Sequence, residues 1–436
     1  REIPIRINLR QSKLIQYTSI HLKENVEVNN EMSTTYSNFA ATTAIHSGSQ
    51  TRAMIPDLFR GLGSKRVVLF SDKGLEEAGV IQRVAEIFEQ TPHGIGPELI
   101  GIFTDIDQDA SSESVNRATR YAREMGADGL LAVGGGSVID CVKGVKFSLH
   151  YGATDIKDLM PSGINNFRWP EAQMIPIPHI TVPTTAGTGS EVSPIAVIYN
   201  EESKIKANII HPFIASNMAV LDPDLTVGLP PFITAFTGFD ALTHAIEALA
   251  SPKATPFTDA YALQTIRMIP KALPEAVKNG ENLNARMEML QASTMGITAF
   301  SFSLSVIPVH NLAHAYGALF RIPHGLANAV FLPLVMEALP QLYLPKIDQL
   351  AEAFGLDTRN QSREEMLAAV VKAIVDLQQT VGLPSDFADY NIPPKSRAMI
   401  AKAVAADPAG LNFPIPDQVI NSIGKKVRGE QAKQTS

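Results

Sequence analysis

Short apolar runs alternate with amphipathic stretches in the first half of the chain, and this alternation limits the possible folds more than any other feature. Strands are predicted at residues 66–70, 99–103, 129–133 and 180–182, and helices at 112–125 and 138–149. Because helices separate these strands along the chain, the strands are expected to pair in parallel through right-handed crossovers. The pattern therefore predicts an open α/β sheet, in which ligands bind at the carboxyl ends of the strands.

The character of the chain changes after about residue 224. Strand signals thin out between residues 231 and 424, where long stretches rich in Ala, Leu and Met take over. A chain of 436 residues is also too long for one ordinary core. We therefore expect an α/β domain over residues 32–224 and an α-helical domain over residues 225–436. Residues 1–31 lack clear periodicity and are interpreted as an extension that is disordered or was added artificially.

Four of the ten histidines fall in two short apolar stretches of the second half. These are His244 in Gly238–Leu249 and His310, His314 and His324 in Val309–Val330, a stretch that has the pattern of a helical segment. Asp240 precedes His244 by four residues, and residues at this spacing share a helix face. A single histidine on an apolar face is usually a core residue, but a carboxylate buried among apolar side chains needs a partner or a metal ion. We therefore predict a mononuclear metal site formed by the two stretches.

Two loops rich in glycine and hydroxyl groups follow predicted strands. In the first, Gly134–Ser137, the glycines Gly135 and Gly136 precede a helix whose free N–H groups suit a pyrophosphate. Glycine clusters are common at such turns, and this one has neither the GxGxxG spacing nor a Walker ending. The second loop, Thr184–Ser190, adds hydroxyl groups and two more glycines after another strand. Together the two loops predict a nucleotide-binding cleft.

Asp72 follows the predicted strand at residues 66–70. A carboxylate at such a strand end can accept hydrogen bonds from a ribose diol, and it would repel a 2′-phosphate. This position predicts a preference for NAD over NADP. The alternative is a turn or cap residue, because Asp-Lys-Gly is favourable turn chemistry.

The net charge and the cysteine content limit the possible binding partners and the cellular compartment of the protein. A net charge of −7 argues against nucleic acid and anionic membranes as partners. No apolar run approaches the roughly 20 residues needed to span a bilayer. The single cysteine, Cys141, excludes an internal disulfide and a multi-cysteine metal site, and it favours the reducing cytoplasm.

Four segments of the sequence resemble the hallmark blocks of iron-dependent, or group III, alcohol dehydrogenases. The segments are GGGSVID (134–140), PTTAGTGSE (183–191), GFDALTHAIEA (238–248) and HNLAHAYGALFRIPHGLANA (310–329). The resemblance extends from about residue 40 to near the C-terminus. It implies a Rossmann-like nucleotide domain followed by an all-α metal-binding domain, the architecture of dehydroquinate synthase, and it implies a homodimer.

The resemblance also implies individual roles. The metal ligands would be Asp240, His244, His310 and His324. His314 would be an additional, catalytic histidine beside the nicotinamide. The cofactor contacts would be Asp72, Gly135, Gly136, Ser137, Thr184, Thr185, Thr188 and Lys206.

The implied activity is hydride transfer between NAD and a small alcohol or diol, with the aldehyde or ketone as the other reactant. The resemblance favours Fe²⁺, and Zn²⁺ is the alternative because imidazole ligands also suit zinc. Other possibilities are a hydroxyacid-oxoacid transhydrogenase that retains its nucleotide, a lyase of the dehydroquinate synthase type, and a non-enzymatic metal-binding protein. Turnover without added nucleotide would identify the transhydrogenase, and NAD reduction by a simple alcohol would exclude the non-enzymatic protein.

Overall fold

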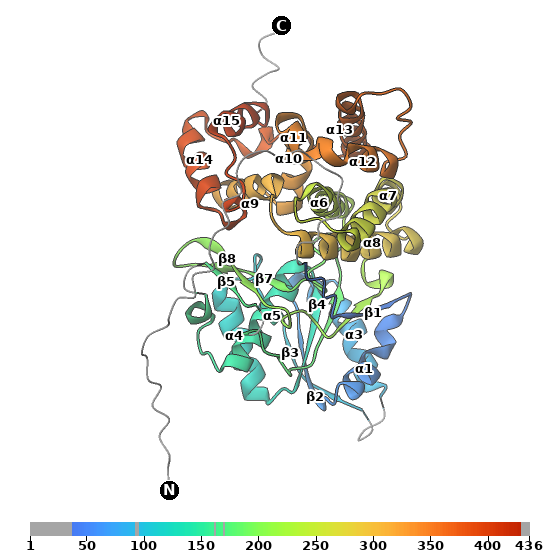
Figure 1. The fold of residues 1–436 in the computed structure, drawn as a ribbon. Helices are drawn as coiled ribbons and strands as arrows, with labels where there is room; N and C mark the ends of the chain where they lie inside the picture. Colours follow the sequence, from blue (N-terminus) through green and yellow to red (C-terminus); the bar gives the residue numbers. More distant parts are fainter. Residues whose placement is uncertain (1–36, 92–95, 161–162, 169–170, 429–436) are drawn as a thin grey trace. The chain divides into compact units, whose positions relative to one another are not determined.

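In the computed structural model, a six-stranded parallel sheet organises the first half of the chain (Figure 1). The structure describes residues 37–91, 96–160, 163–168 and 171–428, so the predicted extension over residues 1–31 lies outside the described residues. The strand order is β1–β9–β6–β4–β2–β3. The strands are β1 (Ala44–Ser47), β2 (Arg66–Phe70), β3 (Glu98–Phe103), β4 (Gly129–Gly134), β6 (His179–Pro183) and β9 (Met218–Leu221).

Helices cover both faces of this sheet. They are α1 (Ile55–Gly61), α2 (Lys73–Glu77), α3 (Val80–Glu89), α4 (Ser112–Met125) and α5 (Gly136–Tyr151). Alternate residues of β2 enter different cores: Val67 and Leu69 pack with α1 and α3, whereas Val68 and Phe70 pack with α4 and α5. Strands buried on both faces read as continuous apolar runs, which is why β2 and β4 were predictable from the sequence.

A second, three-stranded sheet packs against the α4 and α5 side. In it, β8 (Ile205–Ile210) pairs parallel with β5 (Ile164–Asn166) and antiparallel with β7 (Ile195–Asn200). Buried side chains of β7 and β8 belong to the same core as α4 and α5. The sequence analysis did not predict these strands, nor β1 and β9, because each is short and carries no strong periodic signal.

Helices form the second half of the chain, and the described residues from 223 to 428 include no strand. The helices are α6 (Pro231–Ala250), α7 (Pro256–Lys278), α8 (Leu283–Ser303), α9 (Pro308–Phe320), α10 (His324–Ala338), α11 (Pro340–Tyr343), α12 (Ile347–Ala353), α13 (Arg363–Thr380), α14 (Arg397–Ala406) and α15 (Asp417–Lys426). The parallel sheet followed by this helical layer confirms the predicted fold class.

The expectation of one helical segment over residues 309–330 was wrong. Helix α9 ends at Phe320, and Arg321 adopts a left-handed conformation with a φ of 58°. Pro323 then precedes α10, which begins at His324. A left-handed residue ends a helix, and a proline cannot continue one. The break places His310 and His324 on different helices.

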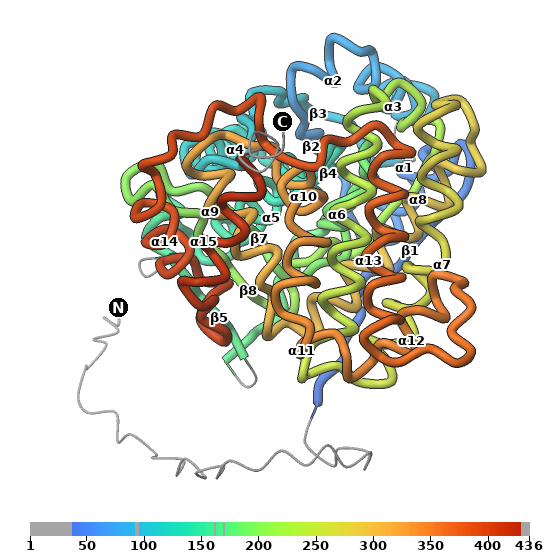
Figure 2. Tube along the Cα trace, turned by 90° about the horizontal axis from the view of Figure 1, so that it is seen from above, coloured from blue at the N-terminus to red at the C-terminus, as the bar shows by residue number. Residues whose placement is uncertain are grey.

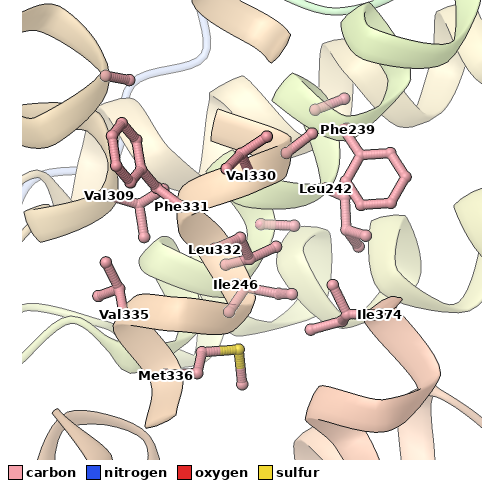
Figure 3. Close-up of a cluster of buried hydrophobic side chains, with 14 of the residues drawn as sticks. Phe239, Leu242, Ile246, Val309, Val330, Phe331, Leu332, Val335, Met336 and Ile374 are labelled. Carbon is pink, nitrogen blue, oxygen red and sulfur yellow. The ribbon is translucent and has the colours of Figure 1, made fainter. Parts of the chain in front are cut away.

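Helices α6 and α10 form the centre of the helical layer. They lie side by side, with α9 and α13 flanking them (Figure 2). Figure 3 shows their apolar side chains meeting, with Leu242 and Ile246 from α6, Leu332 and Met336 from α10, and Ile374 from α13. A helix that is apolar on nearly every side is stable only when neighbours surround it. These two helices therefore provide a rigid support for the polar residues that they carry.

Among the described helices, none is individually long and apolar enough to cross a membrane. Two helix pairs pass that test only when taken together, and they are bent by 105° and 95° at their breaks.

Candidate active site

Three helices bring the predicted metal ligands together. Asp240 and His244 lie on α6, His310 is the third residue of α9, and His324 is the first residue of α10. One oxygen of Asp240 and one nitrogen each of His310 and His324 all lie within 4.8 Å of one another. Asp240 Oδ1 is 3.8 Å from His310 Nε2 and 3.5 Å from His324 Nε2. This spacing suits a single cation that is shared by the three side chains.

His244 lies beside this group but outside its closest set. Its Nε2 is 3.9 Å from Asp240 Oδ1, and its ring stacks on that of His310 with centroids 4.7 Å apart. Asp240 and His244 therefore share one face of α6, as their spacing of four residues predicted. A small movement of the His244 side chain would therefore bring this fourth predicted ligand to the other three.

The protonation of the histidines suits metal binding. Burial lowers the pKa of His244, and it lowers the pKa of His310 and of His324 well below the usual value. Positive charge on the neighbouring imidazoles would act in the same direction. The rings are therefore neutral near pH 7, and a neutral imidazole offers a lone pair to a cation. Together with one carboxylate, this donor set fits a divalent transition metal.

Asn328 is a polar residue of the site that the sequence analysis missed. Its Nδ2 donates to Asp240 Oδ1 at 2.7 Å and lies 3.2 Å from His324 Nε2. Its Oδ1 is buried and has no hydrogen-bond partner among the described residues. Asn328 therefore holds Asp240 in place next to His324. The signal in the sequence was its position four residues after His324 on α10.

Glu247 is the second residue that was missed. It follows Asp240 by seven residues on α6 and has 1 % of its surface exposed. Its Oε2 lies 2.5 Å from Nδ1 of His310, and its Oε1 accepts a hydrogen bond from the N–H of Val309 at 2.7 Å. Burial raises the pKa of this carboxyl well above the usual value. The spacing of seven residues places Glu247 on the same helix face as Asp240 and could have identified it.

His314 has a different set of neighbours from His310. Its Nδ1 is 3.2 Å from Oδ1 of Asp407, and its ring stacks on His324 with centroids 5.2 Å apart. Burial by itself would raise the pKa of Asp407, but the contact with His314 and several hydrogen bonds lower this pKa below the usual value. Asn311 and the N–H of Ala409 also donate to this carboxylate. Asp407 was not identified from the sequence, because it is 93 residues away from His314.

A cavity of about 100 Å³ adjoins the histidines and is lined by both halves of the chain. The helical half contributes His314, His324 and neighbouring residues, and the α/β half contributes Gln108, Asp109 and Lys206. The side chain of His324 is 30 % exposed, whereas that of Asp240 is 3 % exposed. The candidate metal site is therefore reached from this cavity past His324.

The two predicted nucleotide loops lie against each other at the carboxyl ends of β4 and β6. The N–H of Thr184 donates to the carbonyl of Gly134 at 3.1 Å. A Cβ on Gly135 would lie 3.3 Å from Thr185 Oγ1, and one on Gly136 would lie 2.8 Å from Thr188 Cγ2. Gly136 therefore leaves the space that Thr188 occupies, whereas a Cβ on Gly135 would require only a small movement of Thr185. The N-cap position of α5 has no side-chain cap, so its first N–H groups remain available to an anion.

Ser137 and Lys206 both contact the loop that follows β3. Ser137 Oγ accepts a hydrogen bond from the N–H of Asp109 at 3.1 Å, and Lys206 Nζ lies 2.8 Å from Asp109 Oδ1. Asp109 therefore joins the end of the glycine loop to the lysine that lines the cavity. This places Lys206 near the histidines, although 34 positions of the chain separate it from Asp240 and β8 belongs to the smaller sheet.

Asp72 lies just beyond the carboxyl end of β2. It is the N-cap of α2, and its Oδ1 accepts a hydrogen bond from the N–H of Leu75 at 3.0 Å. The preceding residue, Ser71, donates to the carbonyl of Val133 in β4 at 2.7 Å. Asp72 therefore lies at the same edge of the sheet as the glycine loop. The cap role that the sequence suggested as an alternative is present, and the second carboxylate oxygen takes no part in it.

Comparison with known proteins identifies relatives over nearly the whole described chain. Residues 42–223 match the model of the iron-containing alcohol dehydrogenases, and residues 234–421 match that of the Fe-containing alcohol dehydrogenase family, C-terminal. The chain is 33 % identical to long-chain-alcohol dehydrogenase 1 of Geobacillus thermodenitrificans over 350 residues, which cover 80 % of this chain and 85 % of the relative. It is 32 % identical to the NAD-dependent methanol dehydrogenase of Bacillus methanolicus over 349 residues, 79 % of this chain and 87 % of the relative.

A solved structure supports the same family relationship. The crystal structure of a 1,3-propanediol oxidoreductase superposes with a TM-score of 0.82 and 31 % identity, over 90 % of this chain and all of the other. The chain therefore belongs to the iron-containing alcohol dehydrogenase family, which confirms the predicted family, the predicted fold class and the predicted alcohol dehydrogenase activity.

Proposed function

We propose that this protein is an NAD-dependent alcohol dehydrogenase that uses Fe²⁺ to interconvert a small alcohol or diol and its aldehyde or ketone. The observation that carries the proposal is the convergence of Asp240, His310 and His324, whose ligand atoms lie within 4.8 Å of one another at the edge of a cavity. The predicted cofactors, NAD and Fe²⁺, agree with the family and with the name of the Bacillus methanolicus relative.

The four predicted ligands are proposed to hold the metal, with His244 completing the set. A divalent cation bound there supplies Lewis acidity that stabilises negative charge on the substrate oxygen during hydride transfer. The protein's part is to keep three imidazoles neutral and to hold them and the Asp240 side chain at fixed positions. The burial of Asp240, His244 and His310 excludes water from three of the four ligand side chains.

His314 is proposed to handle the proton of the alcohol. In this role Nδ1–H of His314 donates a hydrogen bond to Asp407, and Nε2 is left to exchange a proton with the cavity. The stacking of His314 on His324 places it next to the metal ligands without making it one of them.

The nucleotide is proposed to bind along the carboxyl ends of β2, β4 and β6. The pyrophosphate would face the uncapped amino terminus of α5, and the ribose diol would face Asp72. The residues proposed to contact the cofactor are Asp72, Gly135, Gly136, Ser137, Thr184, Thr185, Thr188 and Lys206.

We also propose two domains, 32–224 and 225–436, a cytoplasmic location and a homodimer without nucleic-acid or membrane partners. The proposed boundary falls within the short 3₁₀ turn Pro223–Leu225, between the last strand and α6. The net charge of −7 and the single cysteine support the compartment and the absence of nucleic acid. The family resemblance supports the dimer.

The test is anaerobic turnover of the purified protein with added Fe²⁺ and NAD against short primary alcohols, diols and their aldehydes. Steady NADH formation with at least one alcohol, abolished by a chelator and restored by Fe²⁺, is the expected result. Turnover between a hydroxyacid and an oxoacid without added nucleotide would instead favour a transhydrogenase. Turnover that a chelator does not reduce would overturn the proposal.

A further inference from the structure

Glu247 combines three properties that an ordinary core residue does not have together. It is a carboxyl group with 1 % of its surface exposed, it lies three residues after His244 on α6, and both of its oxygens contact α9. Burying a carboxyl group costs free energy unless its oxygens are hydrogen-bonded. This costly carboxyl group lies directly beside His310, one of the proposed metal ligands.

One contact of Glu247 supports the backbone of α9. The N–H of Val309 belongs to the first turn of that helix and has no acceptor within the helix. The N-cap residue of α9 makes no side-chain hydrogen bond to this helix end. Instead, Oε1 of Glu247 on α6 accepts the hydrogen bond from the N–H of Val309 at 2.7 Å. The carboxylate therefore caps α9 from a neighbouring helix, where the helix dipole also favours negative charge.

The other contact determines which nitrogen of His310 can bind a metal. A neutral imidazole has one N–H and one lone pair. When Glu247 is ionised, which the N–H groups of Val309 and His310 favour, its Oε2 can only accept, so its partner Nδ1 carries the proton. The lone pair is then on Nε2, the nitrogen that lies 3.8 Å from Asp240 Oδ1. Carboxylates commonly hold metal-binding histidines in this way.

We propose that Glu247 is a positioning residue that keeps the proton of His310 on Nδ1 and directs Nε2 toward Asp240. The inference rests on the proposed role of His310 as a metal ligand. It assigns to one side chain both the capping of α9 and the choice of tautomer at the candidate metal site.

Glu247→Gln separates these two roles with almost no change in shape. The amide has one oxygen, and the main-chain N–H of Val309 can interact only with that oxygen. The NH₂ group then faces Nδ1 of His310 and donates to it, so the proton moves to Nε2 and blocks the lone pair. The variant keeps the cap of α9 but reverses the tautomer of His310.

The experiment measures affinity for metal, not turnover. Apoprotein is titrated with Fe²⁺ under anaerobic conditions, and with Zn²⁺ against a chromophoric chelator. Glu247→Gln is expected to bind each metal about 10–100-fold more weakly than the parent, with an unchanged far-UV spectrum. The ¹⁵N shifts of labelled histidine in the metal-free protein should show His310 protonated at Nδ1 in the parent and at Nε2 in the variant.

A matched control is Glu191→Gln. Glu191 is equally buried, and the contact to its Oε1 is donated by Thr294 Oγ1 at 2.7 Å, which an amide oxygen can also accept. This variant should keep the metal affinity of the parent. Glu247→Ala should lose both metal affinity and stability, because it removes the cap of α9 as well.

Two failures are distinguishable. If His310→Ala binds metal as tightly as the parent, His310 is no ligand, and the proposed function fails together with this inference. If His310→Ala loses metal but Glu247→Gln binds within about twofold of the parent and shows the same tautomer, only the positioning role is overturned.

Discussion

At the scale of single residues, His310 and His314 show how two identical side chains on one helix acquire different chemistry. They are four positions apart on α9, so they lie near one another on its surface. His310 is buried against Glu247, whereas His314 contacts Asp407 and lines the cavity. A buried imidazole with a fixed lone pair suits a metal, and a partly exposed one suits proton exchange.

This difference predicts opposite phenotypes. His310→Ala removes one of the proposed ligands and should lower bound iron to a small fraction of the parent value, with turnover reduced by at least about a thousandfold. His314→Ala should keep stoichiometric iron and lose about 10²–10⁴-fold in kcat. Metal analysis of both purified variants decides between them. Full iron in His310→Ala, or equal loss of iron in both, would mean that the roles are wrongly assigned.

Asp72 serves two purposes, and substitution can separate them. Its Oδ1 caps α2, and the free oxygen is proposed to bind the ribose diol. Asp72→Gly keeps most of the cap stability, because glycine costs only a few tenths of a kcal/mol at that position. It removes the negative charge that opposes a 2′-phosphate by several kcal/mol, so a parent preference for NAD of at least about a hundredfold should relax.

The measurement for Asp72 is kcat/KM for NAD and NADP with one alcohol. Asp72→Asn is the control, because it keeps the cap and a hydrogen-bond acceptor while it removes only the charge. Both variants should admit NADP, and the asparagine variant should retain more activity with NAD. An unchanged ratio in both would show that Asp72 is only a cap.

Residue-level prediction from the sequence succeeded where the signal was local. The spacing of Asp240 and His244 on one helix face is visible in twelve letters of sequence. The contact between His314 and Asp407 spans 93 positions, and nothing near either residue indicates the other. Glu247 was overlooked although its spacing from Asp240 gave a signal, because a glutamate on a long helix is usually taken to face solvent.

At the scale of elements, the loop Thr184–Ser190 packs closely against the helical layer. Gly187 approaches Thr237 on α6, where a Cβ would lie 2.7 Å from the threonine's carbonyl oxygen. Gly189 approaches α8 and has a φ of +58°. The loop that is proposed to hold the nucleotide therefore packs against α6, which carries two of the candidate ligands, and against α8.

Gly189→Ala should disturb this connection severely. Its Cβ would lie 2.2 Å from Ile297 Cγ2 and 2.8 Å from the carbonyl of Ser293. The left-handed backbone adds about 1–2 kcal/mol for any residue with a Cβ, and the clash adds about 1–3 kcal/mol. Urea unfolding should show a loss of stability of about 2–5 kcal/mol, and NAD affinity should fall with it.

The control for Gly189 is Gly228→Ala. A Cβ on Gly228 meets no atom within 4 Å, so that variant should unfold at nearly the parent urea concentration. If Gly189→Ala behaves like Gly228→Ala, the loop is not packed as tightly as the structure indicates.

Helices and strands were predictable where one hydrophobic periodicity dominated the sequence. The helix over Ser112–Met125 and the strand over Arg66–Phe70 have the bounds that were expected. The break between α9 and α10 was missed, because the apolar composition continues through it and only Arg321 and Pro323 mark the turn. The short strands β7 and β8 were missed, because their pairing with each other, and not their sequence, defines them.

At the scale of the whole molecule, the candidate ligands connect α6, α9 and α10, which are also the centre of the helical core. A metal bound only by the folded protein stabilises it by RT ln(1 + [M]/Kd), or about 2.7 kcal/mol at one hundred times Kd. Addition of Fe²⁺ to stripped protein should therefore raise the melting temperature by a few degrees.

Differential scanning calorimetry with and without Fe²⁺ measures this effect. His310→Ala provides the reference, since its melting temperature should not respond to the metal. An identical response in the parent and in His310→Ala would place the stabilising ion somewhere other than between these helices.

The small cavity between the two halves also sets a condition on the speed of catalysis. Its volume of about 100 Å³ is well below the roughly 300–1,000 Å³ of ordinary ligand sites. This volume is too small for a nicotinamide ring and an alcohol together, so we expect the helical layer and the sheet to separate when they bind. Opening and closing steps of this kind commonly limit kcat. Turnover should then slow as solvent viscosity rises, and it should show little isotope effect when the transferred hydrogen is replaced by deuterium.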